Sequence, residues 1–253
     1  MLLETLVPMF VLLGFATVLQ TLSGFGFGLM VVSSFTLFNL LPLTATTFLI
    51  SVLGLVNSTS IVLKNVHLIH RKAFTLVLIG GIPFIAVGYA LLEYLSAGLS
   101  VWLNILLGVA ILTCCLLLIV KRSQSAASGK GWGFIVSGAL GGVLGGLFST
   151  FGPPVVFQCY RQNWSVHEVR YTLLAIFSVT ALIRLAMVPF GTLPDQTTVI
   201  STLFAIPLIL VFTRIGRLLA ARIEPSVVRL LAISTLALSG ITLILQNVPH
   251  LLN

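Results

Sequence analysis

Charge is what this sequence has least of. Only 7% of its 253 residues are Asp, Glu, Lys or Arg, and just five residues are acidic. A soluble domain carries roughly 25% charged residues, so this chain cannot cover a water-facing surface. With 58% apolar residues and a mean hydropathy of +1.18, the composition predicts an all-α polytopic membrane protein.

Motifs of catalysis, metal binding and nucleotide hydrolysis are absent too. The chain has no His-Glu-x-x-His pair, no Gly-x-Ser-x-Gly elbow, no paired carboxylates and no Gly-x-x-x-x-Gly-Lys-Ser/Thr loop. Its three cysteines, Cys114, Cys115 and Cys159, fit neither a disulfide framework nor a metal site. We therefore expect no enzyme, no catalytic residue, no metal and no cofactor.

Ten apolar segments divide the chain. Most approach the length of about 20 residues that a helix needs to cross the hydrocarbon core, but the seventh, 153–160, is too short to cross alone. The segments are Leu3–Leu22, Phe25–Leu40, Leu43–Leu63, Ala73–Leu95, Val101–Val120, Trp132–Phe148, Pro153–Tyr160, Tyr171–Phe190, Val199 to about Ala220, and Val227–Leu245.

Two glycine motifs interrupt the apolar runs. The first is SGFGFG at 23–28, and the second, STFGPP, lies at 149–154. One straight helix from Leu3 to Leu40 would measure about 57 Å, nearly twice the core thickness of about 30 Å. A membrane protein tolerates a broken helix only where the break is buried in protein or lines a cavity. We therefore interpret each motif as the bend of a Gly-rich hairpin with short, tilted or re-entrant arms.

Lys and Arg gather in four loops, which the positive-inside rule places in the cytoplasm. The loops lie at 64–72, 121–130, 161–170 and 214–229. The other loops, 96–100 and 191–196, lack basic residues, so we expect them and both chain termini on the outer side. Residues 1–4 have no basic n-region, so we expect no cleaved signal peptide.

The two halves of the chain correspond at an offset of 124–126 residues. Gly26 corresponds to Gly152, whereas the basic loop 64–72 corresponds to the acidic-leaning segment 188–196. Because corresponding loops differ in charge, we predict two inverted-topology repeats of about five segments each, a device of secondary transporters. The predicted units are a first repeat at 1–122, a cytoplasmic linker at 123–131 and a second repeat at 132–253.

Arg184 is the basic residue that this topology leaves unexplained. It lies in the apolar run 181–187, and no acidic residue stands within two turns of it. A charge inside a membrane helix is costly and by default marks a functional site, and an unpaired guanidinium suits an anionic ligand. The alternative is a side chain that snorkels to the outer interface.

Polar groups near the two breaks complete the candidate site. A helix that begins at Gly152-Pro153-Pro154 directs bare N–H groups and the positive end of its dipole into the hairpin. Alternatively, the glycines of the motifs serve only close packing, as we expect of Gly138, Gly142 and Gly146 at four-residue spacing. The candidate substrate-binding residues are Gln20, Ser23, Gly24, Phe25, Gly26, Asn57, Thr150, Gly152, Pro153, Gln158 and Arg184.

The order of these features resembles a known family. A Gly-rich hairpin, a Pro-containing helix, a second Gly-rich hairpin and the helix start Arg170-Tyr171-Thr172 are similar to the TauE/SafE sulfite exporter family, also called the toluenesulfonate-uptake permease superfamily. The resemblance covers about residues 8–245 and departs at 151–154, where Phe-Gly-Pro-Pro replaces the more usual glycine run. It implies a secondary permease or exporter of small anions such as sulfite, sulfoacetate or toluenesulfonate.

Other function classes stay open at this point. The chain could be a membrane-embedded enzyme acting on lipid or quinone, or a channel or non-catalytic subunit of a membrane complex. As partners we expect a small anionic substrate and the lipid bilayer of a bacterial plasma (inner) membrane, and no nucleic acid. The sequence leaves open the coupling ion, proton or sodium, and assembly as a homodimer.

Overall fold

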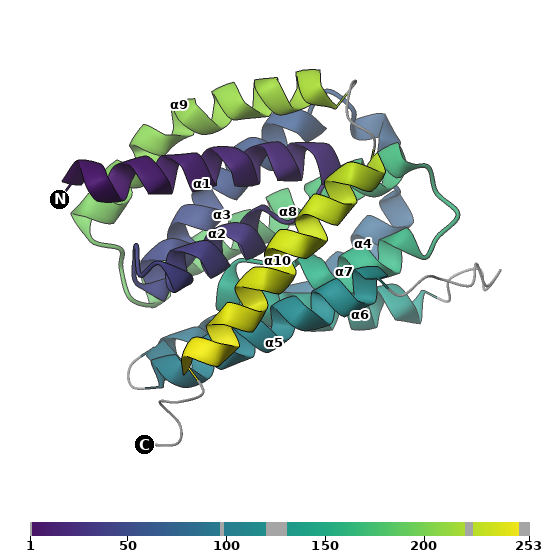
Figure 1. Cartoon of the computed structure of the whole chain (residues 1–253). Helices are drawn as coiled ribbons and strands as arrows, with labels where there is room; N and C mark the ends of the chain where they lie inside the picture. Colours follow the sequence, from purple (N-terminus) through teal and green to yellow (C-terminus); the bar gives the residue numbers. More distant parts are fainter. Residues whose placement is uncertain (1, 97–98, 120–130, 221–224, 248–253) are drawn as a thin grey trace.

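The computed structural model describes residues 2–96, 99–119, 131–220 and 225–247, which are helical and contain no strand (Figure 1). Helix starts and ends fall within a few residues of the predicted segments, and α6 matches its segment at both ends. The α-helices are α1 (Leu2–Ser23), α2 (Phe27–Leu37), α3 (Leu43–Val62), α4 (Arg71–Ser96), α5 (Ser100–Ile119), α6 (Trp132–Phe148), α7 (Gly152–Tyr160), α8 (Val166–Met187), α9 (Gln196–Leu219) and α10 (Pro225–Asn247). Two single turns of 3-10 helix, η1 (Val66–Leu68) and η2 (Val188–Phe190), accompany them.

Within the described residues, four helices are long and apolar enough to cross a bilayer: α3, α4, α8 with its extension η2, and α9. The outward faces of α4, α8 and α9 carry large apolar side chains, such as Ile79, Leu182 and Phe204, that no other helix covers. Water would oppose so much exposed apolar surface, whereas lipid accepts it. The prediction of an all-α polytopic membrane protein is confirmed.

The first glycine motif breaks the chain between α1 and α2. Gly24 and Gly26 both have left-handed backbones, with φ of +84° and +96°, a conformation that costs other residues a clash of their Cβ. Gly26 caps α2, and its carbonyl accepts the first intrahelical bond from the Met30 amide at 2.9 Å. At 11 residues, α2 measures about 16 Å and reaches only about halfway through the hydrocarbon core.

The second motif breaks the chain between α6 and α7, but the left-handed residue there is Ser149, with φ of +55°. The Ser149 hydroxyl donates to the Thr47 carbonyl of α3 at 2.7 Å, which secures a conformation that is unusual for a non-glycine residue. Pro153 lies in the first turn of α7, as predicted. With nine residues, α7 is as short relative to the bilayer as α2.

The contacts between helices follow the correspondence of the two halves. Helix α3 packs on α8 and α5 on α10, while α4 packs on α6 and α1 on α9, side by side in Figure 1. Exchanging α1–α5 with α6–α10 maps the α3–α8 and α5–α10 contacts onto themselves and turns the α4–α6 contact into the α1–α9 contact. The opposite orientation of the halves in the membrane and their boundaries stay predictions, and the predicted linker 123–131 lies outside the described residues apart from Gly131.

Cysteine labelling tests the inverted orientation. In a variant without the three native cysteines, Lys72→Cys and Asp195→Cys occupy corresponding helix starts, at α4 and α9. Because corresponding loops of inverted repeats face opposite sides, we expect an impermeant thiol reagent on intact cells to label Asp195→Cys and to spare Lys72→Cys until the membrane is opened. Labelling of both in intact cells would contradict the inversion.

Candidate functional site

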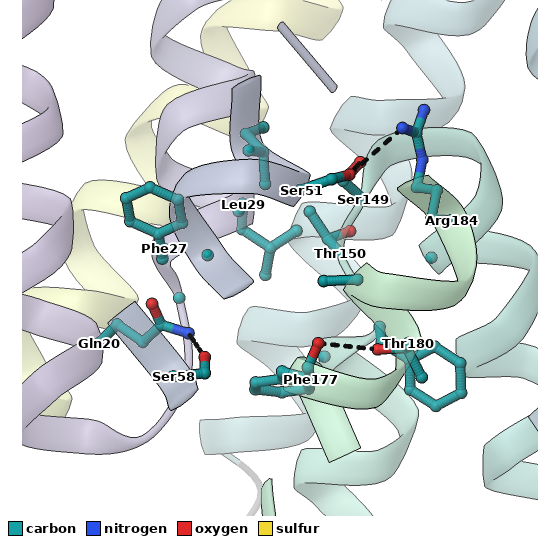
Figure 2. Close-up of a pocket in the computed structure, with 18 of the residues that line it drawn as sticks. Gln20, Phe27, Leu29, Ser51, Ser58, Ser149, Thr150, Phe177, Thr180 and Arg184 are labelled. Atoms are coloured by element: carbon teal, nitrogen blue, oxygen red, sulfur yellow. Dashed lines mark hydrogen bonds between the residues drawn. The ribbon is translucent and has the colours of Figure 1, made fainter. Parts of the chain in front are cut away.

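A cavity lies where the two hairpins meet α3 and α8 (Figure 2). Its volume, taken as the space open to the centre of a water-sized sphere, is about 50 Å³, and one water needs about 10–15 Å³ on this measure. The cavity therefore has room for a few waters or one small ion. Its lining includes Gln20, Gly26, Phe27, Gly28, Leu29, Ile50, Ser51, Ser58, Ser149, Thr150, Gly152, Phe177, Thr180 and Arg184.

Arg184 forms one end of this cavity (Figure 2). Its side chain is 3% exposed, which excludes the snorkelling interpretation. Nε donates to the Gly146 carbonyl at 3.2 Å and Nη1 to the Ser51 hydroxyl at 3.3 Å, while the guanidinium carbon lies 5.3 Å from the centre of the Tyr89 ring. The charge thus sits at the C-terminal end of α6, where the helix dipole favours a cation.

The Arg184 guanidinium has five N–H donors, and the structure assigns acceptors to its Nε and Nη1 groups. Within the described residues no carboxylate lies at ion-pair distance from it. Glu93 is the acidic group whose charge reaches Arg184 at longer range. A buried cation without a close counter-ion is costly, so Arg184 is suited to bind an anion that enters the cavity.

Gln20 and Ser58 lie at the opposite end, hydrogen-bonded to each other (Figure 2). Gln20 Nε2 donates to the Ser58 hydroxyl at 3.2 Å, and Gln20 Oε1 accepts from Asn57 Nδ2 at 2.7 Å. Asn57 Oδ1 in turn accepts from the Thr213 hydroxyl of α9 at 2.7 Å. Asn57 itself does not line the cavity but fixes the orientation of the Gln20 amide that does.

The start of α2 also faces the cavity. Phe27, Gly28 and Leu29 belong to its first turn and line the cavity, and no side chain caps this helix start. Backbone N–H groups in a first turn have no partner within the helix and carry the positive end of its dipole. The start of α7 offers fewer donors, because Pro153 and Pro154 have no N–H.

Arg184 also lines a second cavity, of about 290 Å³. By the predicted topology it opens on the outer side, and Tyr89, Glu93 and Asp195 also line it. The Thr192 hydroxyl donates to the Glu93 carboxylate at 2.5 Å. The hydroxyl of Thr198 donates to Asp195 and lowers the pKa of that carboxyl, so Asp195 is ionised at neutral pH.

The structure brings together five of the eleven predicted site residues, because Gln20, Gly26, Thr150, Gly152 and Arg184 line one cavity. These residues come from α1, α7, α8 and both hairpin bends. The fold brings these residues together although they lie up to 164 positions apart in the sequence.

The other six predicted residues lie elsewhere. Ser23 bonds within its own hairpin, accepting from the Phe25 amide at 3.3 Å. Phe25 packs edge-on to Tyr160, with ring centres 6.3 Å apart. Gly24 contacts Arg170, and Asn57 supports Gln20 from behind. The remaining two, Pro153 and Gln158, are buried in α7 without lining the cavity.

Sequence reasoning missed the polar neighbours of Arg184. Ser51 looks like a serine that bonds its own helix, and it does contact the Thr47 carbonyl at 2.8 Å. The same hydroxyl nevertheless accepts from Arg184 and lies 2.9 Å from Ser149 Oγ. Nothing in the sequence around Tyr89, on α4, indicates a place in the site, since only the packing of α4 against α6 and α8 brings it to Arg184.

Comparison with known proteins identifies the family. The family model of the sulfite exporter TauE/SafE matches residues 9–243. A Cupriavidus necator protein described as a probable sulfite/organosulfonate exporter TauE is 32% identical over 248 residues, which cover 97% of each chain. No solved structure matches this chain. The match over nearly the whole length shows that this chain belongs to the sulfite exporter TauE/SafE family.

Proposed function

We propose that this protein binds a small anion, such as sulfite or sulfoacetate, in the cavity between the two hairpins and moves it across the membrane by alternating access. The observation that carries the proposal is Arg184, a buried cation at the wall of that cavity to which no carboxylate of the described residues lies close. Membership in the family makes the chain a multi-pass membrane transporter of anions and not an enzyme. The substrate and the mechanism are our inference.

The chemistry of the cavity fits an oxyanion. Oxygen atoms of sulfite or of a sulfonate accept hydrogen bonds, and the wall offers donors of several kinds: the guanidinium, the Gln20 amide, hydroxyls and the start of α2. Phe27, Leu29 and Phe177 form apolar walls, which strengthen these charge-assisted bonds by excluding water. In this conformation the volume suits a small oxyanion better than an arenesulfonate, which needs the cavity to open.

The two cavities that Arg184 lines supply a route outward. An anion leaving the central cavity toward the outer one passes Arg184 and Tyr89 and then meets the carboxylates Glu93 and Asp195. Repulsion by these carboxylates favours release over retention there. We propose a bacterial inner membrane as the location, with the termini outside, and a proton or sodium as the coupling ion.

Flux in proteoliposomes tests the proposal. Liposomes that contain the purified protein should take up sulfite or sulfoacetate along an imposed gradient, and the uptake should saturate with concentration. Liposomes with Arg184→Gln protein, verified as folded, are the matched control and should show little uptake. Imposing proton and sodium gradients in turn identifies the coupling ion. Failure of the wild-type protein to carry sulfite, sulfoacetate or toluenesulfonate under every gradient would refute the proposed substrate class.

A further inference from the structure

Helix α8 carries a second buried arginine. Arg170 and Arg184 are 14 residues apart in this helix, which places them about 21 Å apart along the axis and within about 40° of the same face. Phe177 and Thr180 lie between them on this face and line the central cavity. The two guanidinium groups therefore lie near opposite ends of this face, with the cavity-lining residues Phe177 and Thr180 between them.

Arg170 has an unsatisfied polar atom. Its side chain is 8% exposed, and its Nε is buried with no hydrogen-bond partner. A Cβ added at Gly24, in the first hairpin, would lie 3.0 Å from Arg170 Cα and Cγ, so the arginine packs directly on the bend. Its guanidinium carbon lies 5.8 Å from the centre of the Tyr171 ring.

The charges around Arg170 do not neutralise it. Within the described residues no carboxylate forms an ion pair with it, and Arg217 of α9 is close enough for its like charge to act on Arg170. Burial of an unbonded cationic N–H costs free energy that an arriving acceptor would recover.

A purely topological role does not account for this arrangement. The basic residues Arg71, Lys72 and Arg161 on the same predicted side are exposed, as an anchor at the membrane surface should be. Arg170 is buried against the hairpin instead. A positive-inside signal needs neither burial nor contact with the bend that borders the transport cavity.

We propose that Arg170 forms a second anion-binding site on the cytoplasmic side of the first hairpin, where a small oxyanion binds on its way to or from the cavity at Arg184. The inference rests on the proposed function, because it assumes that this protein carries oxyanions. Because the two arginines are about 21 Å apart along α8, anions bound at them repel each other weakly, so both sites can be filled at once.

Equilibrium binding of sulfite to the purified protein in lipid nanodiscs tests this site. The wild-type protein should bind two sulfite ions per chain, and Arg170→Gln and Arg184→Gln should each bind one. Arg170→Lys should keep the second site with an affinity weakened by about tenfold, because Lys retains the charge but not the planar fork. Arg71→Gln removes an exposed charge from the same side and should still bind two.

The outcomes separate this inference from the proposed function. One ion per chain, lost in Arg184→Gln and retained in Arg170→Gln, would leave the central site standing and overturn the site at Arg170. One ion per chain with the reverse pattern would overturn the central site instead. No sulfite binding by the wild-type protein would overturn both. If Arg170→Gln does not fold, unchanged affinities in Arg170→Lys would overturn the proposal.

Discussion

Replacing Arg184 by alanine is expected to weaken the affinity for the transported anion by one to two orders of magnitude. The guanidinium is the cation that borders the central cavity, and a hydrogen bond to a charged group contributes roughly 1.5–3 kcal/mol. Arg184→Lys should lose less, since it keeps the charge. The measurement is the concentration dependence of sulfite or sulfoacetate uptake into proteoliposomes.

Arg184 also holds helices together, and the experiment must separate this structural role from anion binding. Its Nε donates to the Gly146 carbonyl near the end of α6, and its Nη1 to Ser51 of α3. Thermal unfolding without anion therefore serves as a control, and Ser51→Ala, which removes one of these bonds, is the matched variant. An Arg184→Ala protein with unchanged apparent affinity would show that the guanidinium does not bind the anion.

Gly142→Ala is expected to reduce the amount of folded protein severely. Gly142 of α6 faces the Gly81 carbonyl oxygen of α4, and an added Cβ would overlap that backbone atom. Gly138 and Gly146 contact the α4 backbone in the same way, so α4 and α6 pack as closely as the glycine spacing predicts. Separating two helices costs at least the roughly 1–3 kcal/mol of an overpacked core.

Gly26→Ala is the matched comparison for Gly142→Ala. At Gly26 the nearest atom to an added Cβ is Leu19 Cδ2 at 3.4 Å, so space exists. The left-handed backbone, with φ of +96°, costs an alanine about 1–2 kcal/mol and strains the start of α2 beside the cavity. We expect transport to fall more than expression. Equal losses of folded protein in both variants, measured by fluorescence-detected size-exclusion chromatography, would contradict this division of the glycines.

The sequence by itself determined the class of the protein, the positions of its helices and the two breaks. These properties depend on local composition: a lack of charge over 20 residues, or a Gly or Pro that ends a helix, acts through neighbouring residues alone. The backbone conformation at the second break was nevertheless not evident from the sequence. The left-handed residue there is Ser149 and not a glycine, and its bonds to α3 stabilise that conformation.

Only the tertiary structure decided which polar residues share a cavity. Gln20 and Asn57 are equally plausible from the sequence, but the rotation of α1 and α3 directs Gln20 into the cavity and leaves Asn57 behind it. Arg184 meets Ser51 and Tyr89 because α8 packs against α3 and α4, which lie far earlier in the chain. Helix rotation and packing are set by contacts over the whole bundle, and local composition does not record them.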